Sequence, residues 1–133
     1  MLVQVEACGV CGTDLKKILH GDLPPPLVFG HEVGGRVAAV GPGVTRFKPG
    51  ERVLFFHHIP CRNCSFCRSQ NFAQCPQYKR VGTTAGFEPA GGGFAEFVRV
   101  MDWIVKEGLV KIPKGIDAEE AAFVAPVNTC LKG

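Results

Sequence analysis

The sequence predicts a mainly β fold, a small barrel or sandwich of short strands joined by tight turns. Short segments alternate apolar and polar residues, and the 17 glycines and 10 prolines are scattered along the chain rather than gathered in one block. The hydrophobic fraction of 46% is typical of an ordered globular chain. At 133 residues the chain suffices for one domain and is short for a two-domain enzyme.

The first third of the chain contains a strand, a short helix and an extended loop. Residues 2–7 alternate as a half-buried strand does. A helix is expected over residues 13–21, because Thr13 or Asp14 can cap its start and a glycine can end it. Three consecutive prolines exclude a helix from residues 21–32 and favour an extended loop.

Strands and tight turns continue beyond this loop. Residues 33–44 predict a strand that runs into a Gly-Pro-Gly turn, and residues 46–56 predict a Pro-Gly turn followed by an apolar strand. Residues 57–80 show no regular period and are expected to be an irregular loop. Strand-like patterns return in residues 94–100 and 102–108.

The final segment predicts a helix that contains a proline. Asp117 is a suitable N-cap, and Glu120 stands three residues further on, at the position of a capping-box partner. We expect Pro126 to interrupt or kink this helix.

Composition and charge exclude several classes of protein. The formal net charge of +3 is too small to indicate nucleic-acid binding. No run of about eighteen apolar residues is present, and residues 1–15 lack the basic start and apolar centre of a signal peptide. We therefore expect no nucleic-acid partner, no membrane association and a cytoplasmic location.

Four of the seven cysteines are gathered within residues 57–80. They are Cys61, Cys64, Cys67 and Cys75. Disulfides do not persist in a reducing cytosol, whereas four thiolates at short spacings suit a closed, tetrahedral structural zinc site. No acidic residue lies between Glu51 and Glu88, so the nearby cations can offset the negative charge of zinc with four thiolates. These cations are Arg62, Arg68, Lys79 and Arg80.

Free thiols and an iron–sulfur cluster are the two alternatives for this group. So dense a grouping makes four free thiols the weaker explanation. The C-x-x-C-x-x-C pattern is shared with bacterial ferredoxins, but seven residues separate Cys67 from Cys75 where the ferredoxin pattern has about three. A colourless purified protein would exclude the cluster.

A second set of potential metal ligands comes from the motifs "CGVCGTD" and "GHE" near the start of the chain. Its members are Cys11, Thr13, Asp14, His31 and Glu32. Thiolate, imidazole and carboxylate are the groups that a catalytic metal site recruits. Spacing alone leaves the question open, because a single histidine is more often a core or surface residue than a ligand.

Four motifs in order carry a resemblance to a known family. "CGVCGTD", "GHEVGGRVAAVGPGVTRFKPGERV", the four-cysteine segment and "GGFAEFVRV" resemble the catalytic domain of zinc-dependent medium-chain alcohol dehydrogenases, the group that includes sorbitol and threonine dehydrogenases. The resemblance covers nearly the whole chain and implies a GroES-like β-barrel with a few short helices and a zinc-binding lobe.

The resemblance also implies roles for individual residues. Cys11 and His31 would be ligands of a catalytic zinc ion, and Glu32 matches the carboxylate that adjoins the metal. Thr13 would place its hydroxyl beside the substrate alcohol, and Asp14 would support the metal ligands. The four-cysteine segment matches the family's structural zinc site, in agreement with the assignment from spacing and charge.

The implied chemistry is the oxidation of a small-molecule primary or secondary alcohol. Zinc acts as a Lewis acid that lowers the pKa of a bound alcohol, and the hydride passes to the nicotinamide of NAD or NADP. In this family the cofactor domain commonly carries the subunit contacts, so a full-length protein of this kind can be a homo-oligomer.

The chain departs from the family pattern at several positions. Where relatives carry a Glu that supplies the third protein ligand to the catalytic zinc, this chain has Ala125, whose methyl group cannot bind metal. Glu32 or Cys130 could compensate, and Glu32 is the better candidate because Cys130 lies more than a helical turn beyond the ligand position. Many relatives carry a proton-relaying His where this chain has Lys16.

The domain division that follows is also an expectation. Residues 1–116 would be the catalytic domain without its N-terminal β segment, and residues 57–80 would be its structural zinc lobe. Residues 117–133 would begin a helix that leads to a nucleotide-binding Rossmann domain, which is absent because no G-x-G-x-x-G motif is present.

Two hypotheses about function remain. The chain is part of a zinc-dependent NAD(P) alcohol, polyol or threonine dehydrogenase, inactive by itself, or it is a catalytically inactive, zinc-stabilised module in which Ala125 replaces the third ligand.

Overall fold

One five-stranded antiparallel sheet organises the residues that the structure describes. The computed structural model describes residues 1–21, 27–81 and 90–132. The sheet has the strand order β4-β1-β2-β3-β5. Its strands are β1 (Leu2–Gly9), β2 (Glu32–Ala39), β3 (Arg52–Phe55), β4 (Phe97–Arg99) and β5 (Leu109–Lys111). The helices are α1 (Gly12–His20), α2 (Ser65–Arg68), the 3₁₀ helix η1 (Phe72–Gln74), α3 (Pro76–Val81), α4 (Asp102–Glu107), α5 (Ala118–Ala122) and α6 (Val124–Lys132).

The two long strands β1 and β2 form the centre of the sheet. Their register pairs Val3 with Val37, and both side chains are buried while their neighbours along each strand point toward solvent. The alternation in the sequence therefore has its predicted meaning, because successive side chains of a strand face opposite sides of the sheet. The mainly β prediction is confirmed, including the turns that follow β2 and precede β3.

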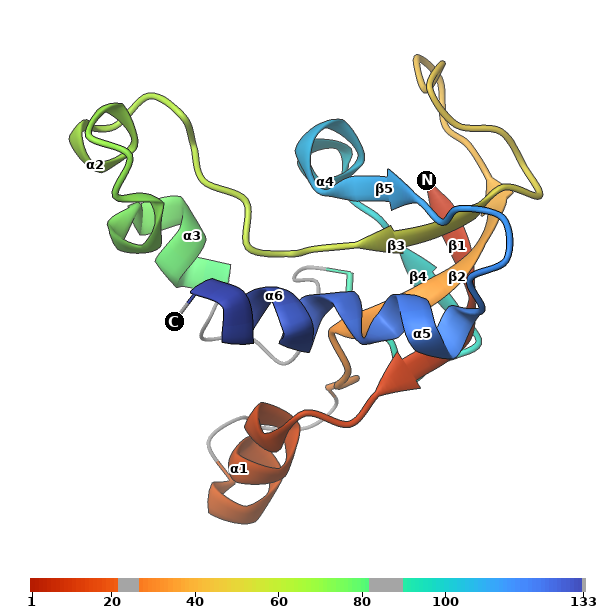
Figure 1. Ribbon diagram of the computed structural model, residues 1–133, viewed down its shortest axis with the longest axis horizontal. Coiled ribbons are helices and arrows are strands. Elements are labelled where there is room, and N and C mark those ends of the chain that lie inside the picture. Colours follow the sequence, from red (N-terminus) through yellow and green to blue (C-terminus); the bar gives the residue numbers. More distant parts are fainter. Residues whose placement is uncertain (22–26, 82–89, 133) are drawn as a thin grey trace.

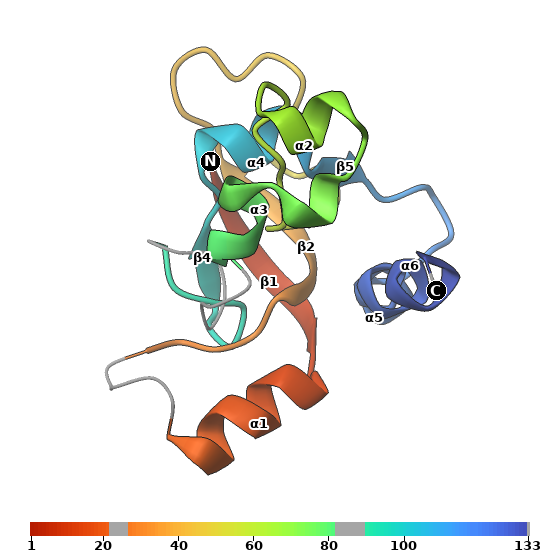
Figure 2. The same ribbon diagram turned by 90° about the vertical axis from the view of Figure 1, so that its left-hand side faces the viewer.

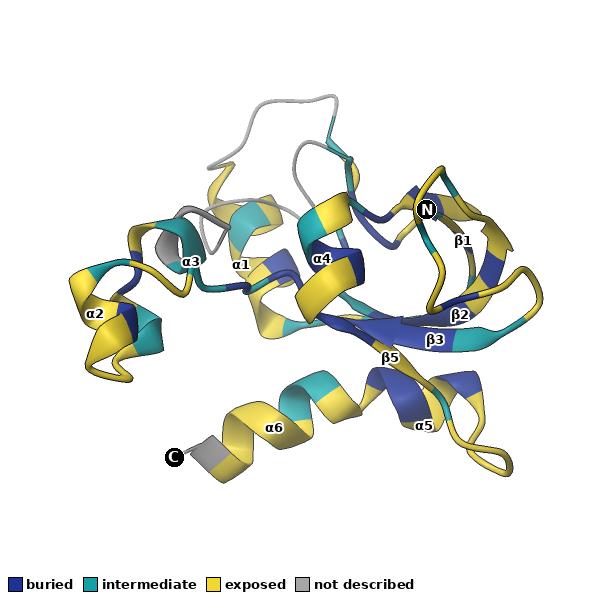
Figure 3. Ribbon diagram, turned by 90° about the horizontal axis from the view of Figure 1, so that it is seen from above, coloured by how far each residue is buried: buried dark blue, intermediate teal, exposed yellow. Residues whose placement is uncertain are grey.

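The hydrophobic core lies against the sheet and beneath α4. Strands contribute most of it, and α4 adds Ile104 and Val105. Figure 3 shows the buried residues concentrated along the strands, whereas α6 is mostly exposed. The cluster of buried apolar side chains contains no described residue from α2, η1 or α3.

Helices α5 and α6 follow one another along one side of the sheet (Figure 1). The predicted capping box is present, since the Glu120 amide donates to the Asp117 carboxylate over 2.7 Å and the Asp117 amide donates to Glu120 over 3.2 Å. Helix α5 ends at Ala122, and Pro126 lies in the first turn of α6, where its missing N–H breaks no helical hydrogen bond. The helix is interrupted as predicted, but the break lies at Phe123, three residues before Pro126.

Two strand and loop predictions are wrong. Residues 102–107 form helix α4, because the neighbouring Ile104 and Val105 are both buried, which a strand with one face toward the core does not allow. Residues 57–80 are more regular than expected, since α2, η1 and α3 supply short helical turns between the cysteines.

The start of helix α1 also differs from the prediction. Cys11 is the N-cap, because its sulfur accepts a hydrogen bond from the Thr13 amide over 3.5 Å. Asp14 completes a capping box by accepting from the Cys11 amide over 3.0 Å. The predicted end is confirmed: Gly21 adopts a left-handed conformation with a φ of 64°, which glycine adopts at no steric cost.

Candidate metal centres

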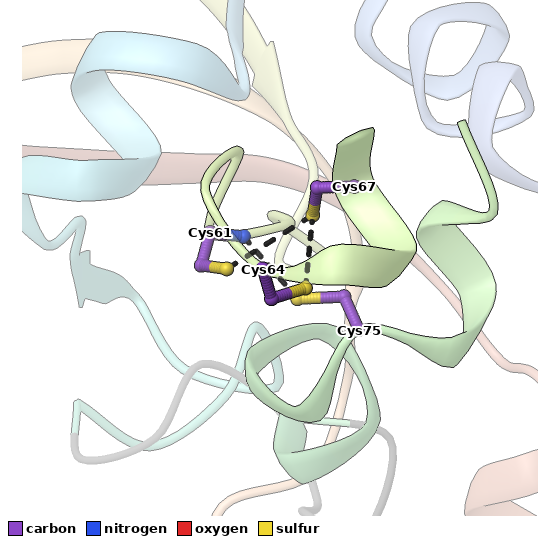
Figure 4. A group of neighbouring side chains, drawn as sticks. All are labelled: Cys61, Cys64, Cys67 and Cys75. Carbon is purple, nitrogen blue, oxygen red and sulfur yellow. Dashed lines mark hydrogen bonds between the residues drawn. The ribbon is translucent and has the colours of Figure 1, made fainter. Parts of the chain in front are cut away.

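The first candidate centre is the tetracysteine lobe, formed by α2, η1 and α3 at one end of the molecule (Figures 1 and 2). Its ligands are Cys61, Cys64, Cys67 and Cys75, whose sulfur atoms all lie within 4.8 Å of one another. Figure 4 shows the four side chains converging from separate turns of the chain. The sulfur atoms of Cys64 and Cys67 lie 3.5 Å apart, and Cys67 and Cys75 are buried. Four converging sulfurs match the donor set of a structural zinc site.

Backbone hydrogen bonds favour the thiolate form of two of these cysteines. The amide of Cys61 donates to the Cys75 sulfur over 3.3 Å. This amide, together with those of Tyr78 and Gln77, lowers the pKa of Cys75 to about 6. The amides of Asn63 and Cys64 lower the pKa of Cys61. Metal ligands must be deprotonated, so these amides favour the form of cysteine that binds metal.

The Cys67 thiol behaves in the opposite way without a metal ion. Burial, and then a hydrogen bond with Cys64, raise the pKa of Cys67 to about 12. A cation among the four sulfurs removes this penalty, because it stabilises every thiolate that it contacts.

The second candidate centre lies where β1 and β2 pair. Strand pairing sets Gly9 opposite Glu32. The segment that follows β1 and contains Cys11 therefore lies close to His31, which directly precedes β2. As a result Cys11, His31 and Glu32 each offer a ligand atom within 4.8 Å of the others. The structure therefore brings together three of the residues singled out in the sequence, although they come from separate segments.

The buried carboxylate of Asp14 supports the second centre through several contacts. Its carboxylate is 1% exposed, and it accepts hydrogen bonds from the backbone amides of Cys11 (3.0 Å) and Gly30 (3.3 Å). The same carboxylate lies 3.4 Å from Nδ1 of His31. A proton on Nδ1, facing Asp14, would leave Nε2 of His31 available to a metal ion, an arrangement common for metal-binding histidines.

A cavity of about 730 Å³ opens over the second centre. Cys11, His31 and Glu32 line it, and so does Thr13. Ala125, at the position where the family pattern carries a ligand, lines the same cavity from α6. Cys130 is exposed on α6 and is not part of either group of potential ligands among the described residues.

Two histidines at the end of β3 form a wall of this cavity. His57 is buried, and its pKa is lowered to about 3 by burial and then by the charges of His58, His31 and Lys17. His57 is therefore neutral at physiological pH. The sequence patterns did not identify His58 or Tyr78 as cavity residues. The only signal was the pair of adjacent histidines directly after an apolar strand.

Cys8, the other cysteine of "CGVCGTD", lies outside both centres. It is half-buried in β1, where it pairs with Val33, and its burial raises the pKa of its thiol to about 11. Cys8 and Cys11 therefore do not bind one metal ion together in the described structure.

Among the described residues, no helix has the length and apolarity needed to span a membrane.

Comparison with known sequences identifies related proteins. The model of the alcohol dehydrogenase GroES-like domain matches residues 1–114. An alcohol dehydrogenase of Geobacillus stearothermophilus is 39% identical over 136 residues, which cover 97% of this chain and 37% of that protein. An L-threonine 3-dehydrogenase of Stenotrophomonas maltophilia is 37% identical over 131 residues, which cover 95% of this chain and 36% of that protein.

Solved structures resemble the described fold as well. A candidate zinc-binding dehydrogenase from Sinorhizobium meliloti 1021, bound to NADP, matches with a TM-score of 0.78 and 37% identity, over 98% of this chain and 36% of that one. Galactitol-1-phosphate dehydrogenase from Escherichia coli matches with a TM-score of 0.74 and 29% identity, over 98% of this chain and 36% of that one. The chain thus spans little more than a third of the relatives that it matches.

Proposed function

The chain belongs to the family of alcohol dehydrogenase GroES-like domains, and from this premise we propose that it is the catalytic portion of a zinc-dependent NAD(P) alcohol or polyol dehydrogenase. The reaction proposed is the oxidation of a small primary or secondary alcohol by hydride transfer. The observation that carries the proposal is the group Cys11, His31 and Glu32 at the base of a cavity that Thr13 also lines.

The donor atoms of both centres suit zinc. A thiolate, an imidazole and a carboxylate are the ligand types of catalytic zinc sites, and four thiolates are those of structural ones. In the second centre we propose Glu32 as the third protein ligand, because Ala125 has no donor atom. When bound there, zinc supplies a Lewis acid that increases the acidity of the substrate hydroxyl.

The residues around the metal have separate tasks. Asp14 keeps His31 in the orientation that leaves Nε2 free, and its two backbone hydrogen bonds fix Cys11 and the loop before His31. Thr13 is exposed on the cavity wall, where its hydroxyl can take the proton of the alcohol while it gives up its own proton to solvent. His57 stays neutral and so adds no positive charge beside the metal ligands.

The cofactor and much of the substrate pocket would come from a part of the enzyme other than these residues. The relatives are about three times as long as this chain, judged by coverage of 36–37%. We propose NAD or NADP as the hydride acceptor, since dehydrogenation of an alcohol needs one and a related structure holds NADP. The partner proposed for the cavity itself is the small alcohol.

A second candidate function is a zinc-stabilised module without catalytic activity. Ala125 favours it, because one of the three protein ligands expected from the family pattern is missing. In this case the tetracysteine lobe would still hold zinc, and the cavity would hold none.

Metal analysis separates the two candidates. The purified chain is loaded with zinc, exchanged into a buffer with a mild chelator, and its metal content measured by mass spectrometry. About two zinc ions per chain before the chelator and one after it would support the dehydrogenase, because the open centre releases its ion first. One ion throughout, together with no second ion in a Cys11→Ser control, would favour the inactive module.

A further inference from the structure

Four aromatic rings form a continuous series between the two candidate metal centres. The ring centroids of His31 and His57 lie 5.3 Å apart in an edge-to-face arrangement. Those of His57 and His58 lie 4.0 Å apart, and those of His58 and Tyr78 lie 4.7 Å apart and are stacked at 25°. We call the series His31, His57, His58 and Tyr78 the ring stack. These separations are those of rings in direct contact.

One end of the ring stack is attached to the tetracysteine lobe. Tyr78 lies in α3, which begins directly after Cys75. The backbone amides of Tyr78 and Gln77 also donate to the Cys75 sulfur, where they help to lower the pKa of that thiol. The position of the Tyr78 ring therefore depends on the position of the Cys75 sulfur, and so on whatever the four sulfurs bind.

The other end of the ring stack is a ligand of the second centre. His31 contacts Asp14 through Nδ1 and lies beside Cys11 and Glu32. His57, the ring against it, has little freedom to move because it is buried, with 9% of its surface exposed. All four rings line the cavity of about 730 Å³, but each also contacts the next one directly, so a displacement of one ring changes the contacts of its neighbour.

We propose that the ring stack couples the two metal centres, with Tyr78 as a positioning residue for His31. An ordered tetracysteine lobe holds Tyr78 against His58, which keeps His57 in its edge-to-face contact with His31. A disordered lobe withdraws this support, so the second centre binds metal less tightly. The coupling rests on the proposed function only in that both centres are taken to bind metal.

The coupling is tested with variants that remove one ring each. Tyr78→Leu removes the ring but keeps an apolar side chain, whereas Tyr78→Phe keeps the ring and serves as the matched control. The chain is loaded with one equivalent of zinc, which fills the lobe, and then titrated with Co²⁺, whose visible absorption bands report binding at the second centre. The expected result is a Co²⁺ affinity about 3- to 10-fold lower for Tyr78→Leu and unchanged for Tyr78→Phe.

A second pair of variants tests the coupling if Tyr78→Leu disrupts the lobe. If Tyr78→Leu loses its lobe zinc, His58→Leu and its control His58→Phe break and keep the ring stack without replacing any residue of α3. The same 3- to 10-fold loss for His58→Leu, with one zinc retained in the lobe, supports the coupling. Equal Co²⁺ affinity and equal spectra for the Leu and Phe variants, with the lobe zinc retained, overturn it.

A measurement that needs no metal in the second centre separates this proposal from the proposed function. The ¹⁵N shifts of the His31 ring are recorded in the chain with zinc in the lobe alone. If the parent takes up no Co²⁺, the proposed function fails, but a change of these shifts in the Leu variants and not in the Phe variants still supports the coupling. Unchanged His31 shifts in all four variants contradict it.

Discussion

Ala125 shows how a single side chain can alter a metal centre without altering the fold around it. It lines the same cavity as Cys11 and His31. Its methyl group offers no donor atom. Glu32 is the carboxylate that the structure sets beside Cys11 and His31, so we expect its contribution to decide how tightly this centre binds metal.

We expect Ala125→Glu to tighten metal binding at the second centre. The added carboxylate completes a set of one thiolate, one imidazole and two carboxylates, so zinc affinity should rise at least about 10-fold, the scale on which residues around a metal site act. Competition with a chromophoric chelator measures the change. Ala125→Gln has the same size without the charge, and equal affinities for the two variants would contradict the expectation.

Cys8 illustrates the opposite case, a cysteine that resembles a ligand and is not one. Its burial raises the pKa of the thiol to about 11, because the charged thiolate is penalised in the half-buried strand. The thiolate is the reactive form, so we expect slow alkylation of Cys8 at pH 8, with a rate that continues to rise as the pH approaches 11.

Mass spectrometry of the zinc-loaded chain treated with iodoacetamide measures this reactivity. Zinc protects the ligating cysteines, and the exposed Cys130 in α6 is the internal control. Modification of Cys130 well before Cys8 is the expected order. Equal rates for the two cysteines at pH 8 would show that Cys8 is more accessible than the structure indicates.

At the scale of elements, one glycine determines how closely α5 approaches β2. A Cβ atom added to Gly34 would meet the backbone oxygen of Ala118 at 2.5 Å, so a methyl group fits only if the helix moves away. Helix α5 packs on β1 and β2 and continues into α6, which carries Ala125 to the cavity. The contact at Gly34 therefore helps to place one wall of the candidate site.

We expect Gly34→Ala to destabilise the chain by about 1–3 kcal/mol, the usual cost of forcing an extra group into a packed site. Urea unfolding followed by circular dichroism measures the change. Gly41→Ala is the control, because nothing lies within 4 Å of a Cβ added in that turn, and it should change stability by less than about 0.5 kcal/mol. Similar losses for both variants would contradict the packing argument.

At the scale of the whole molecule, the sheet and the tetracysteine lobe depend on different interactions. The sheet has a continuous apolar core, to which α2, η1 and α3 contribute none of the described buried members. These three helices are 4, 3 and 6 residues long. Helices of this length are not stable by themselves, so we expect the lobe to need a bound metal ion to remain folded.

Removal of the lobe metal should therefore unfold the lobe and leave the sheet intact. After treatment with a strong chelator, we expect amides of residues 61–81 to exchange with deuterium within seconds, whereas the core strands β1 and β2 remain protected. Hydrogen exchange with mass spectrometry resolves the two regions, and Cys67→Ser should produce the same pattern without a chelator. Loss of protection in both regions together would show one cooperative unit instead.

The sequence predicted the parts of the fold that depend on local patterns. Alternation identified β1 and β2, the capping box at Asp117 is present, and the family resemblance holds for the chain as a whole. The strand prediction for residues 102–108 was wrong because a segment of that length fits a strand and a helix equally well. Burial of Ile104 and Val105 together decided for the helix, and burial is a property of the tertiary structure.

The candidate ligands divide in the same way. Residue types and spacing within one segment indicated the tetracysteine group, because four cysteines within a short stretch can reach one ion without any distant partner. The motifs also named Cys11, His31 and Glu32 by resemblance. Their convergence required the pairing of β1 with β2, which brings residues twenty positions apart in the sequence to within 4.8 Å.

The sequence by itself determined the family, the strand pattern and the chemical types of the candidate ligands, because each depends on residues that are neighbours in the chain. Only the tertiary structure decided which side chains share a cavity: it brought Ala125 into the cavity of the candidate ligands and connected Tyr78 and His58 to His31 through ring contacts. Contacts between distant segments depend on packing, and no local pattern encodes packing across the fold.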